Sequence, residues 1–517
     1  MERTWATSGP YGDEDAAVPV GEGAGTATAA DMAAAVGADL HLDLAGQGRR
    51  GVRAALTRAL REAVRSGRLA PGVRLPSSRS LAVDLGLARN TVAEAYGELV
   101  AEGWLTARQG SGTRVAQRSA PASRRAGERR STPPRVPARP LHDLRCGAAD
   151  VSVFPRAAWL SAARRAMAVA PHEAFGYGDG RGRPELRAAL AGYLARARGV
   201  RADPERIVVV AGFTQGLALL GEVLRRRGVR AMGVESYGLW VHQGIVERSG
   251  LRPVPMALDA YGAVIGELDG TDEGAGDGEG DGAVGAALLT PAHQFPTGVP
   301  LHPDRRAAVV DWASRTGGLI VEDDYDGEFR YDRQPVGALQ NLAPEHVVYC
   351  GTAGKALAPG VRLAWLVLPE HLLGDVLELK RTGEWGLSAL DQLTLAEFIE
   401  TGAYDRHVRA MRLRYRRRRD QLVDALAEHA PHVRVTGIAA GLHAVLELPP
   451  GTERTTVQAA TWRGLALEGL SRFRHPAAPP SQAAPARDAL IVAYGTPPDH
   501  AFPGALEALL SVLPPAE

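Results

Sequence analysis

Lysine is the rarest charged residue of this chain, and one of its two lysines lies inside a candidate functional motif. Of 60 basic residues, only Lys355 and Lys380 are lysines, and the others are arginines. A lysine amine, unlike an arginine, can lose its proton in a protein and form a Schiff base with a carbonyl compound. Lys355 stands in the segment GTAGKALAPGVRLAWLVLP and is therefore a candidate for covalent chemistry. An ordinary surface lysine is the alternative.

Four polar motifs, including the one around Lys355, lie at the ends of apolar runs that predict β-strands. In chain order they are AGFTQGLALL, TPAHQFPTGVPL, VEDDYDGEFRY and GTAGKALAPG. Apolar runs alternate with helical patterns from about residue 141 onward, which predicts an α/β fold with a mainly parallel sheet. Ligands bind at the carboxyl ends of the strands in such sheets, so we expect the four motifs to converge.

A separate helical unit precedes this region. Apolar residues recur every four positions from Val52 to Val64 and give one helix face. A second helix is expected to open at 76–78, and a third to run from Arg89 until Gly103 stops it. Residues 105–115, with Gly-Ser-Gly at their centre, suit a β-hairpin. This order predicts a winged helix-turn-helix.

Charge is uneven along the chain, although the formal net charge is only +1. Residues 1–48 carry eight acids and one base, a net charge of −7. Residues 49–118 carry a net charge of +8, and residues 119–140 add +5. A basic block of this kind points to nucleic acid, and a solvated basic surface is the alternative.

Composition divides the rest of the chain. Residues 1–37 are rich in Gly and Ala and are expected to be a disordered acidic tail. Residues 117–142, rich in Pro, Ser and Arg, are expected to be a flexible linker. The helical unit is then assigned to residues 38–116 and the large α/β domain to residues 143–517.

The same composition bears on localisation. No apolar stretch is long enough for a membrane-spanning helix, and the N-terminus has no signal-peptide pattern. The two cysteines, Cys146 and Cys350, fit a reducing compartment. We therefore expect a cytoplasmic protein that does not associate with membranes.

The segment LPSSRSLAVDLGLARNTVAEAYGELVAEGWLTARQGSGTRV resembles the DNA-binding domain of GntR-type bacterial regulators. A helix N-terminus offers free N–H groups to phosphate, and arginine suits the paired acceptors of guanine. Ala88 stands where the family often has a Ser or Thr cap, so a cap worth ~1 kcal/mol is expected to be missing. A helical trio that serves only protein contacts is the alternative. The resemblance implies that the DNA-contacting residues are Arg79, Arg89, Asn90 and Thr91 on the helices and Gln109 and Gly110 in the wing.

Together the four motifs resemble the fold-type I aminotransferases, which use pyridoxal 5′-phosphate (PLP). They look closest to the MocR/GabR subfamily, in which a GntR-type reader is fused to an aminotransferase-like domain. The resemblance runs from about residue 144 to the C-terminus. It implies a mainly parallel seven-stranded sheet followed by a smaller C-terminal α/β subdomain.

The resemblance assigns roles around the ring of PLP. Lys355 would form the Schiff base, Asp323 would face the pyridine nitrogen, and Tyr325 would donate a hydrogen bond to the phenolic oxygen. Tyr237 is expected to stack on the ring, although the Pro of the family's Glu-x-Pro-x-Tyr segment is missing here. Tyr177 resembles a tyrosine that reaches the phosphate of the partner subunit, which implies a homodimer.

The phosphate group needs cations and hydrogen-bond donors. Arg362 lies seven residues after Lys355 and is expected to supply the charge, with Thr352 as a neighbouring donor. A helix that starts at Thr214, Gln215 and Gly216 would add free N–H groups and the positive end of its dipole.

The C-terminal strand LIVAYGTPP departs from the amino-acid-binding members of the family. In those members an arginine near this point holds the substrate carboxylate, whereas Thr496 is the best match here. The departure weakens both an active transaminase and an amino-acid sensor. It favours a sensor of the cofactor itself.

We therefore predict a PLP-dependent transcriptional regulator in which PLP, or a PLP–amine adduct, at Lys355 shifts the two DNA readers of a dimer. Two readers predict a double-stranded operator with paired half-sites, in promoters of vitamin B6 or amino-acid metabolism genes. An active PLP-dependent aminotransferase that carries a DNA-binding domain is one alternative, and a nucleic-acid binder without a cofactor is another.

Overall fold

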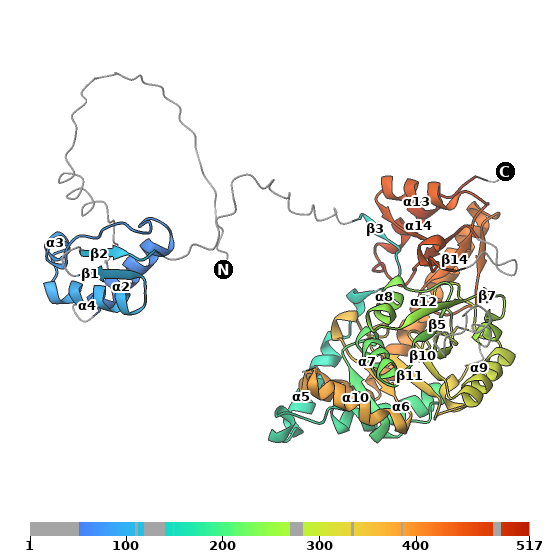
Figure 1. Ribbon diagram of the computed structural model, residues 1–517. Coiled ribbons are helices and arrows are strands. Elements are labelled where there is room, and N and C mark those ends of the chain that lie inside the picture. The colour runs from blue at the N-terminus through green and yellow to red at the C-terminus, as the bar shows by residue number, and fades with distance from the viewer. Residues whose placement is uncertain are drawn as a thin grey trace, which may run out of the picture. The chain divides into compact units, whose positions relative to one another are not determined.

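The computed structural model describes residues 51–108, 112–117, 140–147, 149–268, 283–331, 336–383, 386–478 and 487–515. The chain divides into two compact units between residues 137 and 138, and each is described by itself (Figure 1). The acidic tail and nearly all of the linker expected from the sequence lie outside the described residues. Within the described ranges, no helix has the length and apolar character needed to cross a membrane.

The small unit contains three helices and a two-stranded hairpin. The helices are α2 (Val52–Arg65), α3 (Ser78–Asp84) and α4 (Arg89–Ala101). Strands β1 (Leu105–Arg108) and β2 (Gly112–Val115) pair antiparallel, with Leu105 opposite Val115. The winged helix-turn-helix order predicted from the sequence is confirmed.

Two kinds of contact hold the helices of the small unit together. Leu56 and Leu60 of α2 pack against Leu81, Val92 and Leu99 in a core without solvent exposure. Besides this core, α2 and α4 are joined by polar contacts that recur every four residues. These contacts are Arg53 with Glu94 at 3.3 Å, Thr57 with Glu98 at 3.2 Å and Arg61 with Glu102 at 2.7 Å.

The large unit is built on a seven-stranded sheet in the order β4-β12-β11-β10-β9-β5-β6. The strands are β4 (Ile207–Val210), β5 (Ala231–Glu235), β6 (Arg252–Met256), β9 (Val284–Leu289), β10 (Leu319–Asp323), β11 (Val347–Thr352) and β12 (Ala364–Val367). β12 is antiparallel to both of its neighbours, and the other six strands run in one direction. The mainly parallel sheet expected from the sequence is confirmed.

Helices cover both faces of this sheet (Figure 1). Val208 and Val210 of β4 point to a core shared with α7, α8 and α10, while Ile207 and Val209 point to the opposite core. This alternation explains why the strands are continuous apolar runs, because both faces are buried. The covering helices are α7 (Phe213–Arg226), α8 (Trp240–Arg248) and α10 (Glu370–Thr382) on one face and α6 (Pro184–Arg198), α9 (Pro303–Thr316), α11 (Ala389–Glu400) and α12 (Ala403–His429) on the other.

A smaller four-stranded antiparallel sheet lies in the C-terminal part of the unit. Its order is β13 (Arg434–Thr436), β14 (Ala444–Glu447), β17 (Ala489–Val492) and β16 (Glu468–Gly469). Helices α13 (Glu453–Trp462) and α14 (Phe502–Leu510) belong to this subdomain. Other elements of the unit include α5 (Arg156–Val169) and the short pair β7 (Leu258–Asp259) and β8 (Gly262–Ala263).

The first described residues of the large unit attach to this subdomain. β3 (His142–Asp143) pairs parallel with β15 (Leu465–Ala466). The Leu144 amide then donates to the Ala466 carbonyl, and the Leu144 carbonyl accepts from the Ala493 amide at 2.8 Å. The segment that leads from the linker is thereby fixed before it reaches Gly147.

Candidate functional site

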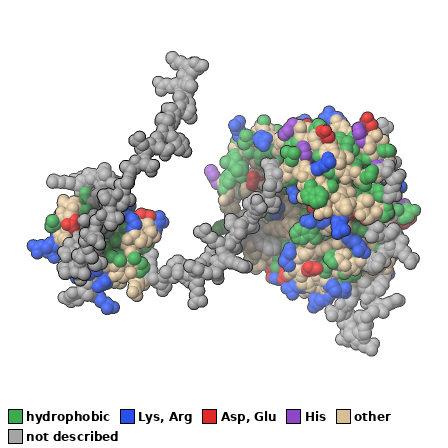
Figure 2. All heavy atoms as spheres, turned by 90° about the horizontal axis from the view of Figure 1, so that it is seen from above, with side chains coloured by type: hydrophobic (Ala, Val, Ile, Leu, Met, Phe, Trp, Pro, Cys, Tyr) green, Lys and Arg blue, Asp and Glu red, His purple; other side chains and the backbone are tan. Residues whose placement is uncertain are grey.

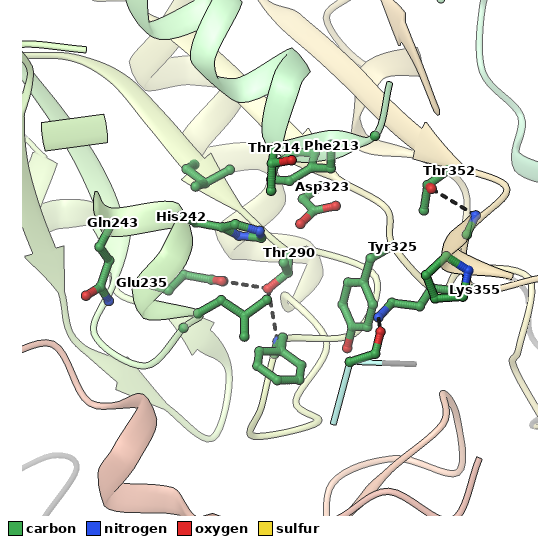
Figure 3. Close-up of a pocket in the computed structure, with 18 of the residues that line it drawn as sticks. Phe213, Thr214, Glu235, His242, Gln243, Thr290, Asp323, Tyr325, Thr352 and Lys355 are labelled. Atoms are coloured by element: carbon green, nitrogen blue, oxygen red, sulfur yellow. Dashed lines mark hydrogen bonds between the residues drawn. The ribbon is translucent and has the colours of Figure 1, made fainter. Parts of the chain in front are cut away.

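One edge of the seven-stranded sheet collects the functional motifs. The carboxyl ends of the six parallel strands lie at this edge, and so does the amino end of β12, because it alone runs the other way. The loops there enclose a cavity of about 280 Å³ (Figure 3). The lining residues that carry the argument below are Gly212, Thr214, Glu235, Tyr237, His242, Asp323, Tyr325, Thr352, Lys355 and Arg362.

Lys355 projects into this cavity from the loop after β11. Its Nζ donates a hydrogen bond to the Gly147 carbonyl at 2.8 Å. Loss of hydration lowers the pKa of Lys355, while the nearby Cys146, Asp326 and Asp323 act in the opposite direction. A lowered pKa favours the neutral amine, which is the form that attacks a carbonyl carbon.

Asp323, the last residue of β10, is buried and directs its carboxylate into the same cavity (Figure 3). Within the part of the chain that the structure describes, this carboxylate has neither a hydrogen-bond donor nor an ion-pair partner. Burial raises the pKa of Asp323 well above its usual value, the neighbouring Asp324 raises it further, and Lys355 opposes the rise. If this carboxylate is ionised, a cationic or hydrogen-bond-donating ligand would stabilise it.

The opposite end of the cavity suits an anion. Arg362 adopts a left-handed backbone conformation with φ 54°, and its guanidinium lies over Gly212. A Cβ on Gly212 would come within 3.2 Å of Arg362 Nη1, so this close approach requires glycine, as does the φ of +101°. Gly212 precedes the start of α7, and Thr352 also lines the cavity.

The three residues predicted to bind the phosphate, Thr214 to Gly216, lie in the first turn of α7, which begins at Phe213. Thr214 lines the cavity, but Gln215 and Gly216 are not among its lining residues. Their amides both bond to the Gly212 carbonyl, at 3.1 and 3.3 Å. Gly216 instead packs against Leu366, where a Cβ would come within 2.9 Å of Cδ2.

Two aromatic rings from the loop after β5 and the start of α8 face the cavity. Tyr237 lines it, and the Tyr237 carbonyl accepts from Gln294 Nε2 at 2.9 Å. His242, which sequence reasoning missed, packs on Phe213 with 4.8 Å between ring centroids. Burial lowers the pKa of His242 to about 4, so its ring is neutral near pH 7. The stacking role of Tyr237 stays a prediction.

Other residues at the cavity carried weak sequence signals. Glu235 ends β5 and accepts from Thr290 Oγ1 at 2.6 Å, and burial raises the pKa of Glu235 to about 7. Glu235 and Thr290 both follow apolar runs at the edge where ligands bind, and that position is the signal that could have identified them. Gly147 was not identifiable, because its contact with Lys355 spans 208 residues.

Two sequence-predicted positions lie outside the cavity. Thr496 Oγ1 donates to the Arg145 carbonyl at 3.0 Å and does not line the cavity. Among the described lining residues, Arg362 is the only arginine. Tyr177 is fully exposed, as a residue that reaches another subunit would be in a single chain.

In the small unit, the residues predicted to contact DNA lie at two helix starts. Arg79 is the second residue of α3 and is exposed, and Arg89 and Asn90 are exposed at the start of α4. Thr91 is half-buried, and its amide bonds to the Ala88 carbonyl at 3.0 Å. Ala88 provides no side-chain cap. The other two positions, Gln109 and Gly110, lie outside the described residues.

Arginines of the small unit differ in their partners. Arg53, Arg61 and Arg65 form ion pairs with carboxylates. Arg79 and Arg89 have no carboxylate partner in residues 51–108 and 112–117. Figure 2 shows basic side chains standing out from the surface of this unit. Cations without internal partners are available to an external anion such as the DNA backbone.

Comparison with known proteins identifies both units. Residues 48–115 match the family of bacterial regulatory proteins called gntR, and residues 147–477 match aminotransferase class I and II. The chain belongs to the GntR-type transcriptional regulators that carry an aminotransferase-like domain. The family and the regulator function predicted from the sequence are confirmed, and the aminotransferase alternative is not favoured.

Relatives of this regulator match over most of their length. It is 34% identical to the HTH-type pyridoxine biosynthesis transcriptional regulator PdxR of Corynebacterium glutamicum, over 81% of this chain and 88% of that protein. It is 32% identical to the probable rhizopine catabolism regulatory protein MocR of Rhizobium meliloti, over 82% and 87%. It is 33% identical to the HTH-type transcriptional regulator YdeL of Bacillus subtilis, over 81% and 90%.

Solved structures support the fold of the large unit. An archaeal alanine:glyoxylate aminotransferase matches 72% of this chain and 90% of its own, with a TM-score of 0.62 and 23% identity. The kynurenine aminotransferase of Pyrococcus horikoshii matches 72% and 91%, with a TM-score of 0.63 and 22% identity. At this identity the likeness shows the aminotransferase fold alone.

Proposed function

We propose that this regulator binds PLP at Lys355 and that PLP, or its adduct with an amine, is the signal that changes operator binding. The observation that carries the proposal is the Asp323 carboxylate. It is buried at the cavity without a described protein partner, and it shares that cavity with the desolvated amine of Lys355. A pyridine nitrogen that keeps its proton would supply the missing partner.

The other lining residues fit the remaining groups of PLP. Arg362, Thr352 and the start of α7 after Gly212 would hold the phosphate, and Tyr325 would donate to the phenolic oxygen. When bound, PLP supplies an aldehyde that reacts with amines and a ring that withdraws electrons. The protein residues bind, orient and exclude water around these groups.

The charge of the cavity narrows the class of effector. Arg362 is the only lining arginine in the described chain, and it lies at the end that suits the phosphate. His242 is neutral near pH 7, so it offers no second cation for a carboxylate. We therefore propose PLP itself, or an amine without a carboxylate, rather than an amino acid. The name of the pyridoxine biosynthesis regulator, 34% identical, supports a vitamin B6 target.

The regulator is proposed to act in the cytoplasm as a homodimer on operators with paired half-sites. Four apolar side chains between residues 156 and 175 are exposed in the single chain, which is unfavourable unless another surface covers them. They are Leu160, Met167, Val169 and Phe175. Tyr177 follows directly and is fully exposed, so a partner that covers this face would bring its own site close to Tyr177.

The proposal is tested by titrating operator DNA binding with PLP. Pyridoxine 5′-phosphate is the matched control ligand, because it keeps the phosphate and the ring but lacks the aldehyde. We expect PLP to change the operator affinity of the wild type and to leave Lys355→Arg unaffected. Further arms add a simple amine or an amino acid to the PLP-bound protein. Equal effects of PLP and pyridoxine 5′-phosphate would contradict a role for the aldehyde.

A further inference from the structure

We infer that a buried pair of side chains, Asp326 and His293, holds the Tyr325 hydroxyl in place as a hydrogen-bond donor to the ligand at Lys355. The two act as positioning residues through Tyr325 and do not contact the reacting atoms. This inference rests on the proposed function, since it concerns the same cavity. It assigns a purpose to the His of HQFPTG and to the second Asp of DYDGEF.

The pair contacts the hydroxyl group of Tyr325 through His293. His293 Nδ1 is 2.8 Å from Asp326 Oδ2 and 3.0 Å from the Tyr325 hydroxyl oxygen. His293 and Asp326 are 4% and 2% exposed, so water does not compete for these contacts. Tyr325 is only partly buried and lines the cavity, where Figure 3 shows its ring beside the Lys355 side chain.

The proposed arrangement places the hydrogen on His293 Nδ1. This nitrogen lies within hydrogen-bond distance of two oxygens, and in this arrangement the Asp326 carboxylate accepts from it. The same N–H also faces the Tyr325 oxygen, which then accepts and keeps its own hydrogen for donation. Burial raises the pKa of Tyr325 well above its usual value, and the charge of Asp326 raises it further. Tyr325 therefore stays a neutral donor throughout the physiological pH range.

The surroundings hold the pair rigidly. His443 packs on His293 with 5.1 Å between ring centroids, and it donates from Nε2 to the Pro296 carbonyl at 3.0 Å. Gly441, with φ +73°, lies so close that a Cβ there would overlap both His293 and Asp326. The other titratable side chains around the pair are Cys146, Asp323, Lys355, Tyr331 and Tyr494.

Two substitutions of His293, by Leu and by Asn, distinguish a hydrogen-bonding role of this side chain from a packing role. Asn and Leu have nearly the same volume, but only Asn places an N–H near the position of His293 Nδ1. We expect His293→Leu to weaken PLP binding about tenfold, the loss of one well-placed hydrogen bond, and to shift the visible absorption maximum. His293→Asn should restore affinity to within about twofold of the wild type.

The background variant Tyr325→Phe completes the test. Without the hydroxyl, His293→Leu and His293→Asn should bind PLP equally. Asp326→Asn should likewise weaken binding only when Tyr325 is present. Binding is measured by absorbance titration on the full-length protein, and near-UV circular dichroism and thermal unfolding without PLP report that the large unit of each variant is folded.

Several outcomes would overturn the inference. One is equal PLP affinity of His293→Leu and His293→Asn in the wild-type background. Another is an unchanged effect of His293→Leu after Tyr325→Phe. A third is the presence of stoichiometric zinc in the purified wild type that is lost in both His293 variants. A metal bound to His293 Nδ1 would prevent this nitrogen from contacting the Tyr325 hydroxyl. A wild type that gives no absorbance change with PLP would instead refute the proposed function itself.

Discussion

Arg89 and Arg362 are both assigned to an anion, yet the two units present them differently. Arg89 stands exposed at the start of α4 without a described carboxylate partner. Arg362 is held by a left-handed backbone and lies over Gly212 at the wall of the cavity. Under the proposed assignments, the small unit offers an exposed charge to a long polyanion, whereas the large unit offers a charge at a defined position to one small group.

Other charged and polar side chains of the two units also differ: several around the cavity are buried, and the carboxylates of the small unit lie at its surface. Around the cavity, Asp323, Glu235 and His242 are desolvated, and the pKa of each is shifted by burial. In the small unit, carboxylates pair with arginines on the surface between α2 and α4. Surface charge is screened by salt and buried charge is not, so operator binding should respond strongly to ionic strength and PLP binding only weakly.

The largest expected effect is on the cavity alone. Lys355→Ala should abolish the visible absorption that PLP produces on the protein, because no other lysine lines the cavity. Lys355→Arg, which keeps the positive charge but cannot form a Schiff base, should behave in the same way. Absorption spectra of both variants measure the loss. Retention of the band in either variant would exclude Lys355 as the attachment point.

The next largest effect should fall on the small unit alone. Arg89→Ala should weaken specific operator binding by about 1–3 kcal/mol and leave the PLP spectrum unchanged. Arg58→Ala is the matched control, since Arg58 is equally exposed but lies on α2. That control should reduce only the salt-dependent, non-specific share of binding, measured by fluorescence anisotropy at two salt concentrations. Equal losses in the two variants would refute the major-groove assignment of Arg89.

A smaller effect should follow from changing the wall of the cavity. Gly212→Ala adds a Cβ beside Arg362 at a φ that alanine tolerates poorly, so PLP affinity should fall by about 1–2 kcal/mol. Gly360→Ala is the control in the Arg362 loop, where a Cβ meets no atom within 4 Å. PLP titration followed by absorbance compares the two. A Gly212→Ala protein with wild-type affinity would show that Arg362 does not need its present position.

The smallest effect should be a gain in stability. Ala88 has the extended backbone of an N-cap, with φ −67° and ψ 136°, but lacks an acceptor side chain. Ala88→Ser should stabilise the small unit by ~1 kcal/mol, and Ser77→Ala, which removes the cap of α3, should cost a similar amount. Thermal unfolding of residues 49–117 reports both changes. A decrease in stability for Ala88→Ser would mean that the present geometry rejects the cap.

Sequence reasoning succeeded where a pattern is local. The alternation of apolar runs and helices predicted the sheet, and the strand-end motifs predicted which loops meet, because all parallel strands expose their carboxyl ends at one edge. The role predicted for Gln215 and Gly216 stays a prediction. Neither residue lines the cavity, and sequence does not fix a helix start closely enough to say which amides are free. The closeness of Gly212 to Arg362 was not predictable, because it joins residues 150 positions apart.

The contact between His293 and Asp326 was not predictable from the sequence for the same reason. His293 and Asp326 each stand in a motif that the sequence had singled out, but their contact depends on two loops from neighbouring strands β9 and β10. Tyr237, by contrast, was predicted from a motif that is incomplete here. It does line the cavity, and His242 lines it as well.

The hydrogen bond between Lys355 and Gly147 connects the cavity to the route toward the DNA reader. A ligand that bonds covalently to the Lys355 amine would compete with the Gly147 carbonyl for this nitrogen. Gly147 ends the segment that β15 and β17 fasten, and that segment is the covalent continuation of the linker. Under the proposed function, loss of this contact would release one attachment of the segment that continues into the tether of the DNA-binding unit.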